Sequence, residues 1–308
     1  IQDMFPDRGK NTSRKFPMSA KSSYNSPMLG KRFIFVLLLS VAAGVRGQAL
    51  EPRFYSNAPV GLNFVLGGYV HSTGGLSFDP ALAVDDAELD VNAAVVAYAR
   101  SLGVFGKSAK FDLVLPYSYL SGTAIRNGSP ISRKVDGLND PQIRVSINLL
   151  GAPALTLAEF RDYQQNFVLG TSIAITAPLG QYDNTKLVNI GMNRWSFKPE
   201  LGMSKTFGPL ILELAGAATL YTDNDDALGF RLEQDPLYSV QGHLVYTFPR
   251  QIWIALDGTY YTGGQTTLGG DEKDNALDNT RLGITAAFPV NKYHSIKLYV
   301  SSGISTRT

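Results

Sequence analysis

Apolar and polar residues alternate with a period of two along most of the chain from about Leu62 onward. Every second residue from Ala109 to Tyr119 is apolar or aromatic, whereas Lys110 and Asp112 lie among the residues between them. Successive side chains of a β-strand point to opposite faces. The alternation therefore predicts strands with one apolar and one polar face, which is typical of a strand between lipid and a polar lumen.

Eleven segments of this kind are bounded by Gly, Pro, Asn or Asp turns. They lie near 61–71, 89–101, 109–121, 141–150, 166–177, 195–206, 210–222, 237–248, 252–262, 280–288 and 295–305. A tilted strand needs about 9 to 11 residues to cross a bilayer, whereas soluble strands are usually shorter. The pattern predicts an all-β fold, a transmembrane antiparallel β-barrel. A soluble β-sandwich is the alternative.

The connections between these segments alternate between long and short. Those at 72–88, 122–140, 178–194, 223–236 and 263–279 are long and polar, and the others are short except 151–165. Bacterial outer-membrane barrels have short periplasmic turns, long outer loops and an even strand number. We therefore expect 12 strands, of which the closing one is missing from this chain, so that the full protein continues for roughly 10 to 20 residues.

The parity of each segment assigns its side chains to a face. We expect these apolar residues to face lipid: Leu62, Phe64, Leu66, Leu89, Val91, Val95, Ile143, Val145, Ile147, Leu149, Leu212, Leu214, Leu220, Val240, Leu244, Tyr246, Phe248, Ile252, Ile254, Leu256, Tyr260, Leu282, Ile284, Phe288, Ile296, Leu298 and Val300. We expect the opposite face to line the lumen with Lys110, Asp112, Arg144, Lys198, Glu200, Glu213, His243, Asp257, Arg281 and Lys297, together with Asp90 and Arg100.

The signs of these lumen charges are nearly balanced. One interpretation is a charged lumen that selects solutes. The other is a salt-bridged filling that holds a narrow barrel shut. The sequence also leaves open whether residues 50–60 fold back into the barrel.

The N-terminus has the features of a secretion signal. Residues 1–27 are polar and basic, and we expect them to be a disordered or non-native extension. Residues 28–49 fit a signal peptide, with Lys31 and Arg32 before an apolar run and Gly47-Gln48-Ala49 as a cleavage site. The alternative, a membrane anchor, would need a longer apolar run. Residues 50–308 would then form the barrel.

Charge and composition exclude several classes of function. Residues 50–308 carry 20 Lys plus Arg against 24 Asp plus Glu, a net charge of −4, which does not suit a nucleic-acid binder. The chain has no cysteine and only three histidines, His71, His243 and His294, without a G-x-S-x-G signature. We expect no enzyme, no cofactor and no metal site, although a barrel lipid hydrolase is a remote alternative.

Several short sequences resemble one outer-membrane barrel family, named for the meta-pathway of phenol degradation. They are the segment 189–202 with its Asn193-Arg194-Trp195 core, the preceding Pro-Leu-Gly-Gln-Tyr at 178–182, Gly-Leu-Asn-Asp-Pro at 137–141, Gln-Asp-Pro at 234–236, Gly-His at 242–243 and Tyr-Tyr-Thr-Gly-Gly at 260–264. We expect Asn193, Arg194 and Trp195 to lie at the barrel mouth, where Trp195 can anchor at the headgroups. The roles open to this core are gating and a structural lock for the third loop.

The resemblance implies an outer-membrane channel or transporter of small, aromatic or hydrophobic solutes in a Gram-negative bacterium. We expect passive diffusion through a charged lumen. The expected partners are outer-membrane lipid and lipopolysaccharide, the outer-membrane assembly machinery and a small-molecule solute, with no nucleic acid. The alternative is a non-conducting structural or surface-interaction barrel.

Overall fold

The predicted strands are all present in the structure, a computed structural model that describes residues 33–42, 51–76, 84–126 and 128–305. All of these residues belong to one unit, Lys31–Thr308. The eleven predicted segments correspond to β2 (Asn63–Leu76), β3 (Val84–Val104), β4 (Lys107–Arg126), β6 (Gln142–Leu150), β7 (Phe167–Thr176), β8 (Ser196–Phe207), β9 (Leu210–Tyr221), β12 (Leu237–Thr247), β13 (Trp253–Gly263), β16 (Leu277–Pro289) and β17 (His294–Ser305). The all-β prediction is confirmed.

Further elements lie outside the predicted segments. They are β1 (Phe33–Ala42), β5 (Ser129–Leu138), β10 (Asn224–Ala227), β11 (Phe230–Gln234), β14 (Thr266–Leu268), β15 (Asp271–Glu272) and the short 3-10 helices η2 (Glu159–Arg161) and η3 (Pro249–Gln251). No helix in the described part of the chain is both long and apolar enough to cross a membrane.

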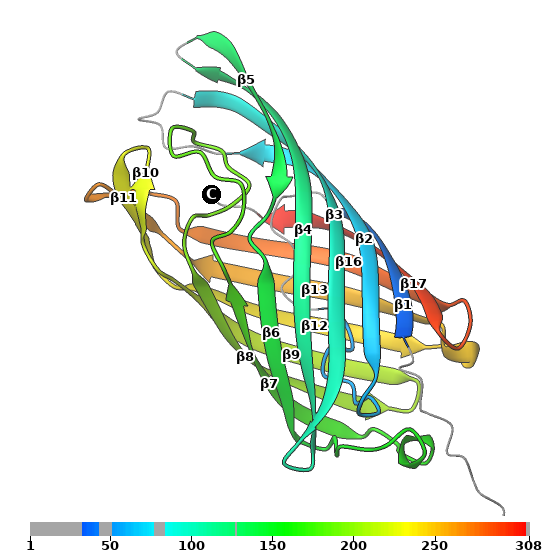
Figure 1. Cartoon of the computed structure of the whole chain (residues 1–308). Coiled ribbons are helices and arrows are strands. Elements are labelled where there is room, and N and C mark those ends of the chain that lie inside the picture. The colour runs from blue at the N-terminus through cyan, green and yellow to red at the C-terminus, as the bar shows by residue number, and fades with distance from the viewer. Residues whose placement is uncertain (1–32, 43–50, 77–83, 127, 306–308) are drawn as a thin grey trace, which may run out of the picture. The chain divides into compact units, whose positions relative to one another are not determined.

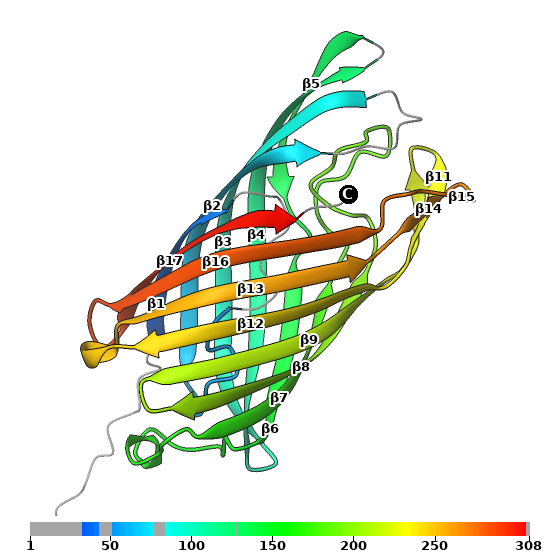
Figure 2. The ribbon, with the colours of Figure 1, turned by 180° about the vertical axis from the view of Figure 1, so that it is seen from behind.

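In the described residues, eleven strands from β2 to β17 form one antiparallel sheet that curls on itself (Figures 1 and 2). Each strand pairs with the next long strand in sequence, as in a meander. The long β3–β4 hairpin extends past β6, and β5 pairs with its outer part from Tyr117 to Arg126. β10, β11, β14 and β15 form a small separate sheet within the long loops.

β1 lies between β2 and β17 and is parallel to both. It occupies the place expected for a twelfth strand, antiparallel to its neighbours, and it consists of residues of the predicted signal peptide. Backbone N–H and C=O groups left unpaired in hydrocarbon cost several kcal/mol each. The facing edges of β2 and β17 therefore need a strand between them to pair their backbone groups. Cleavage of the signal peptide stays a prediction.

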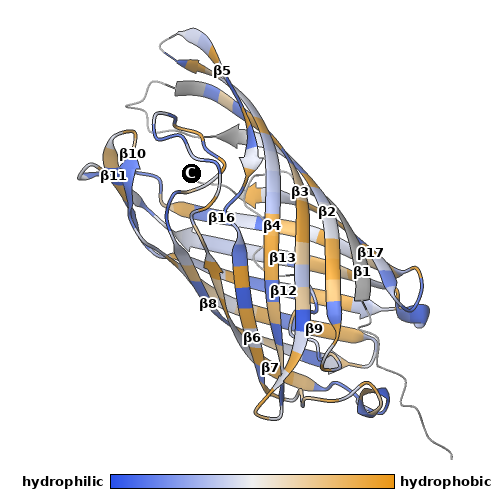
Figure 3. Cartoon of the chain, in the orientation of Figure 1, coloured by the Kyte–Doolittle hydropathy of each residue, from blue (hydrophilic) through white to orange (hydrophobic). Residues whose placement is uncertain are grey.

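Most of the predicted lipid-facing residues are exposed on the outer face of the sheet. Register and exposure agree on β9, β12, β13 and β16, where Leu214, Leu244, Leu256 and Leu282 are 45 to 57% exposed while their chain neighbours Glu213, His243 and Asp257 are buried. Figure 3 shows hydrophobic and hydrophilic bands alternating along the strands. An apolar outer face is what a membrane-spanning barrel requires.

The parity prediction is wrong for β2 and β3. Leu89 and Val91 are 5% and 8% exposed and face inward, where they pack with Leu120 and with Val188 of the loop between β7 and β8. The register places Phe64, Leu66 and Val95 on the same inner face, while Asp90 and Arg100 point outward. Leu89 and Val91 face inward here because Val188 of a folded-in loop packs against them.

Candidate functional site

All ten predicted lumen residues lie on the inner face of the sheet. The register joins Asp112 to Arg144 across β4 and β6, and it aligns Glu213, His243 and Asp257 across β9, β12 and β13. The Lys198 ammonium is 3.6 Å from the Glu200 carboxylate. Lys110 and Lys297 bond to the segment described next, and Arg281 lies opposite Thr259 on β13.

Residues 51–60, called here the inner segment, lie inside the barrel. Its Tyr55 side chain is buried, at 5% exposure. Its hydroxyl donates to Glu200 Oε1 at 2.8 Å, and its carbonyl accepts from Asn148 Nδ2 at 3.2 Å. The Tyr55 ring rests on Gly170 and Gly202, where an added Cβ would lie 2.3 and 2.2 Å from ring carbons. Glycine at these two positions of β7 and β8 is therefore what admits the ring.

Phe54 attaches the inner segment to β4 and β6. The Lys110 ammonium lies 4.0 Å and the Arg144 guanidinium 4.9 Å from the centre of the Phe54 ring, within the range of cation–π attraction. The Lys110 ammonium also donates to the Phe54 carbonyl. Two of the predicted lumen cations therefore bind the inner segment itself.

Arg53 and Glu51 attach the inner segment to the other side of the sheet. The Arg53 backbone N–H donates to Glu213 Oε2 at 2.6 Å, and its guanidinium lies 5.9 Å from the centre of the inward-facing Trp253 ring. Glu51 forms an ion pair with Lys297 of β17. The inner segment thus extends across the lumen from β17 to β7.

Beyond Tyr55, the inner segment binds the connection between β6 and β7. The Asn57 backbone N–H donates to Gln165 Oε1 at 3.0 Å, and its amide donates to the Pro153 carbonyl at 3.1 Å. The Val60 N–H donates to the Leu155 carbonyl at 2.8 Å. The unusually long 151–165 link therefore has a structural use as a support for the inner segment.

A second buried cluster lies on β12, β13 and β16. His243 Nδ1 is 2.6 Å from Asp257 Oδ1, Thr285 donates to Asp257 Oδ2, and Gln241 Nε2 lies 3.1 Å from His243 Nε2. An acyl-transfer site needs a nucleophilic hydroxyl at the outer imidazole nitrogen. In the described residues that place holds the Gln241 amide, and the cluster joins three strands of the wall.

Asp140 organises the loop between β7 and β8. Its Oδ1 accepts from the Gly180 N–H at 2.8 Å and its Oδ2 from the Met192 N–H at 2.7 Å. A Cβ on Gly180 or Gly191 would lie within 3.0 Å of Asp140 Oδ1. One carboxylate therefore fastens both ends of the loop.

The Asn193-Arg194-Trp195 core forms a second junction at the mouth. The Asn193 amide donates to Asn224 Oδ1 at 2.9 Å. Arg194, 7% exposed, donates to Gln234 Oε1, and its guanidinium lies 4.7 Å from the centre of the Tyr221 ring. Trp195 points outward and is 45% exposed. The loops that precede β8, β12 and β16 meet here, because Gln234 also donates to the Gly264 carbonyl at 2.8 Å.

No cluster of three or more His, Asp or Glu side chains suited to a metal ion occurs within the described ranges. The acidic loop residues Asp223, Asp225 and Glu233 instead surround Arg231. The site is therefore built from the lumen charges, the inner segment and the loop junctions. Sequence reasoning missed the role of the inner segment, although its Arg-Phe-Tyr sequence between the cleavage motif and the first strand is a usable signal.

Comparison with known proteins agrees with this architecture. The crystal structure described as the COG4313 outer membrane channel from Pseudomonas putida F1 is similar, with a TM-score of 0.65 and 20% identity, covering 83% of this chain and 93% of that one. No curated protein matches the sequence. The family model described as "Putative MetA-pathway of phenol degradation" matches residues 54–308, which include most of the inner segment, all the long antiparallel strands and both loop junctions. The chain therefore belongs to the family that this model describes.

Proposed function

We propose that this protein is an outer-membrane channel of a Gram-negative bacterium that passes small hydrophobic or aromatic solutes by passive diffusion. The observation that supports this most directly is the pairing of an apolar outer face with a lumen that is lined by charge and narrowed by the inner segment. A similar fold in a solved outer-membrane channel also supports it.

The inner wall favours small solutes with apolar surface. The side chains of Phe64, Leu66 and Val95 give β2 and β3 an apolar inner face, opposite the charged groups of β8 and β9. The inner segment crosses the lumen, so a wide aqueous pore for large hydrophilic solutes does not fit. A charged wall opposite an apolar wall suits small amphipathic or aromatic solutes.

A non-conducting barrel is the second candidate. Its support is the network that joins Glu51, Arg53, Phe54 and Tyr55 to the lumen charges, because such a network can hold a narrow barrel closed. The two candidates predict different fluxes through the same folded protein.

Liposome swelling separates the two candidates. The purified barrel, reconstituted into liposomes, is diluted into isosmotic phenyl β-D-glucoside, a neutral aromatic solute, or into arabinose. We expect swelling faster than that of protein-free liposomes, with the aromatic solute at least as fast as arabinose despite its larger size. Absence of swelling with both solutes, from protein shown to be folded by heat-modifiable gel migration, would overturn the channel proposal and favour the closed barrel.

A further inference from the structure

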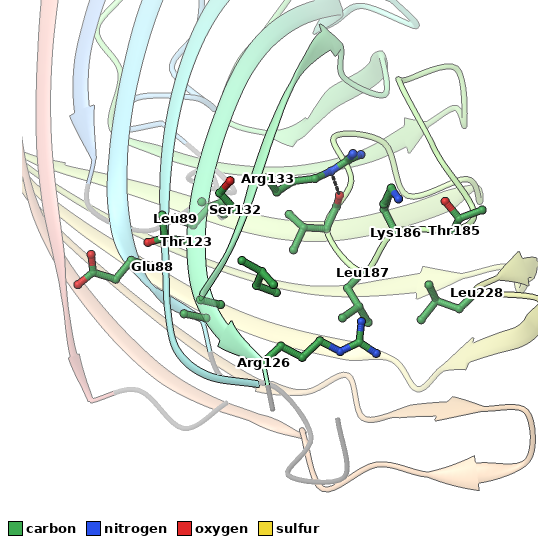
Figure 4. A pocket seen from close by; sticks show the side chains of 15 residues that line it. Glu88, Leu89, Thr123, Arg126, Ser132, Arg133, Thr185, Lys186, Leu187 and Leu228 are labelled. Atoms are coloured by element: carbon green, nitrogen blue, oxygen red, sulfur yellow. Dashed lines mark hydrogen bonds between the residues drawn. The ribbon is translucent and has the colours of Figure 1, made fainter. Parts of the chain in front are cut away.

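A cavity of about 440 Å³ lies under the loops at the long-loop end of the barrel (Figure 4). It is lined by residues of β3, β4 and β5, by Thr185–Val188 of the β7–β8 loop and by Leu228 of the β10–β11 turn. Its volume falls in the range of about 300–1,000 Å³ that is common for small-molecule sites. It lies apart from the inner segment, which contacts other residues.

The floor of this cavity is apolar. Leu89 belongs to the buried cluster with Val91 and Leu120, and Val188 packs against that cluster from the loop. Leu187, Ile131 and Leu228 add apolar surface around the opening. These side chains would bury the apolar body of a ligand, which favours binding by removing apolar surface from water.

The rim of the cavity is predominantly positive. Arg126, Arg133 and Lys186 line it, whereas the register places the Glu88 side chain with Asp90 on the outer face of β3. Within the described part of the chain, none of these three cations has a carboxylate at ion-pair distance. The field at the rim therefore favours an anion.

Two of these cations are placed by the loop that Asp140 fastens. Arg133 Nε donates to the Val188 carbonyl at 3.3 Å, which orients the guanidinium along the cavity wall (Figure 4). The hydrogen bonds from Thr185 lower the pKa of the loop residue Asp183, and the charges of Lys186 and Arg133 lower it further. The positive charges of Lys186 and Arg133 therefore act on the carboxylate of Asp183, which also accepts a hydrogen bond from the Thr185 hydroxyl.

We propose that this cavity binds a small amphipathic carboxylate, with an apolar or aromatic body and a single negative charge, before it enters the barrel. The apolar floor takes the body, and Arg126, Arg133 and Lys186 bind the carboxylate, with the hydroxyl of Thr185 available as a further donor. This inference rests on the proposed channel function and specifies its substrate class.

Calorimetric titration of the full-length barrel in lipid nanodiscs tests the proposal, with 3-phenylpropanoate as the probe and the neutral 3-phenylpropanol as its isostere. We expect the carboxylate to bind at least about tenfold more tightly than the alcohol, a difference of roughly 1.4 kcal/mol. The double variant Arg126→Gln/Lys186→Gln should lose this preference. The matched control Arg231→Gln removes an outer-loop cation that lies outside the cavity and should bind as the parent does.

Equal affinity for the acid and the alcohol, or an unchanged preference in the double variant, would overturn the proposal. If the double variant fails to fold, the single variant Lys186→Gln replaces it, and its preference should fall in the same direction. If only the channel proposal is wrong, the result is different: the carboxylate would still bind, but the protein would cause no liposome swelling.

Discussion

Deletion of residues 51–59 is expected to raise the single-channel conductance by roughly threefold or more, because a barrel of this strand number is wide enough to conduct once its filling is removed. The inner segment crosses the lumen from Lys297 on β17 to the Gly170 and Gly202 surface of β7 and β8. Its removal also releases Lys110 and Arg144 from the Phe54 ring, which adds exposed positive charge to the conducting path. Planar-bilayer recording of the parent and the deletion variant measures the effect.

A point substitution gives an independent test of the same occlusion. Gly202→Val places a side chain where the Tyr55 ring lies, since even a Cβ there would be 2.2 Å from the ring, and it should raise conductance by displacing Tyr55. Gly216→Val is the matched control on the outer face of β9, where the nearest atom would be 4.0 Å from the new Cβ. Parent-like conductance in both the deletion and the Gly202→Val variant would contradict the account of the inner segment.

Replacement of Asp140 by alanine is expected to lower the free energy of unfolding by roughly 2–4 kcal/mol, because hydrogen bonds to a charged group contribute about 1.5–3 kcal/mol each. The variant leaves the N–H groups of Gly180 and Met192 without their acceptor, so both ends of the β7–β8 loop come loose. Urea unfolding from lipid, together with the rate of protease cleavage between residues 178 and 195, measures the two consequences.

The matched control for this experiment is Asp136→Ala. Asp136 lies nearby on the exposed β5 and accepts from the Tyr117 hydroxyl, without holding a loop. We expect its stability to lie within about 0.5 kcal/mol of the parent, as for surface substitutions generally. Equal stability of the Asp140 and Asp136 variants would show that the carboxylate does not fasten the loop.

Period-two alternation predicted the strands closely, because the lipid and lumen faces impose opposite chemistry on neighbouring residues. β9 and β12 begin at the predicted Leu210 and Leu237 and end one residue earlier than predicted. The same rule failed at Leu89 and Val91, because a distant loop supplies Val188 as their apolar partner. Local parity contains no information about a loop that folds inward from about a hundred residues away.

The sequence predicted which residues line the lumen, but it did not predict their partners. The lumen residues follow from parity, but the partner of each charge depends on which strands face one another across the barrel. Lys110 and Lys297 were expected to face solute or opposing carboxylates, whereas they bind Phe54 and Glu51 of the inner segment. The inner segment has no periodic pattern, since each of its side chains fits a different strand.

The family resemblance located the mouth residues, which the alternation of apolar and polar residues does not identify. Asn193 and Arg194 were assigned to the mouth from a family-like sequence, and the structure joins them to Asn224 and Gln234. Arg194 is buried and stacked on Tyr221. This geometry favours a structural lock between loops over a freely moving gate.

Accessibility of single cysteines along β12 tests the central claim, that hydrocarbon covers one face of each strand and the lumen the other. The chain has no cysteine, so each introduced thiol can carry one spin label without background. Labels at Tyr238, Val240, Leu244 and Tyr246 should collide more with lipid-dissolved oxygen, and those at Ser239, Gln241 and His243 more with a water-soluble nickel complex. A profile without this period of two, or one in which both faces meet water equally, would contradict the membrane barrel.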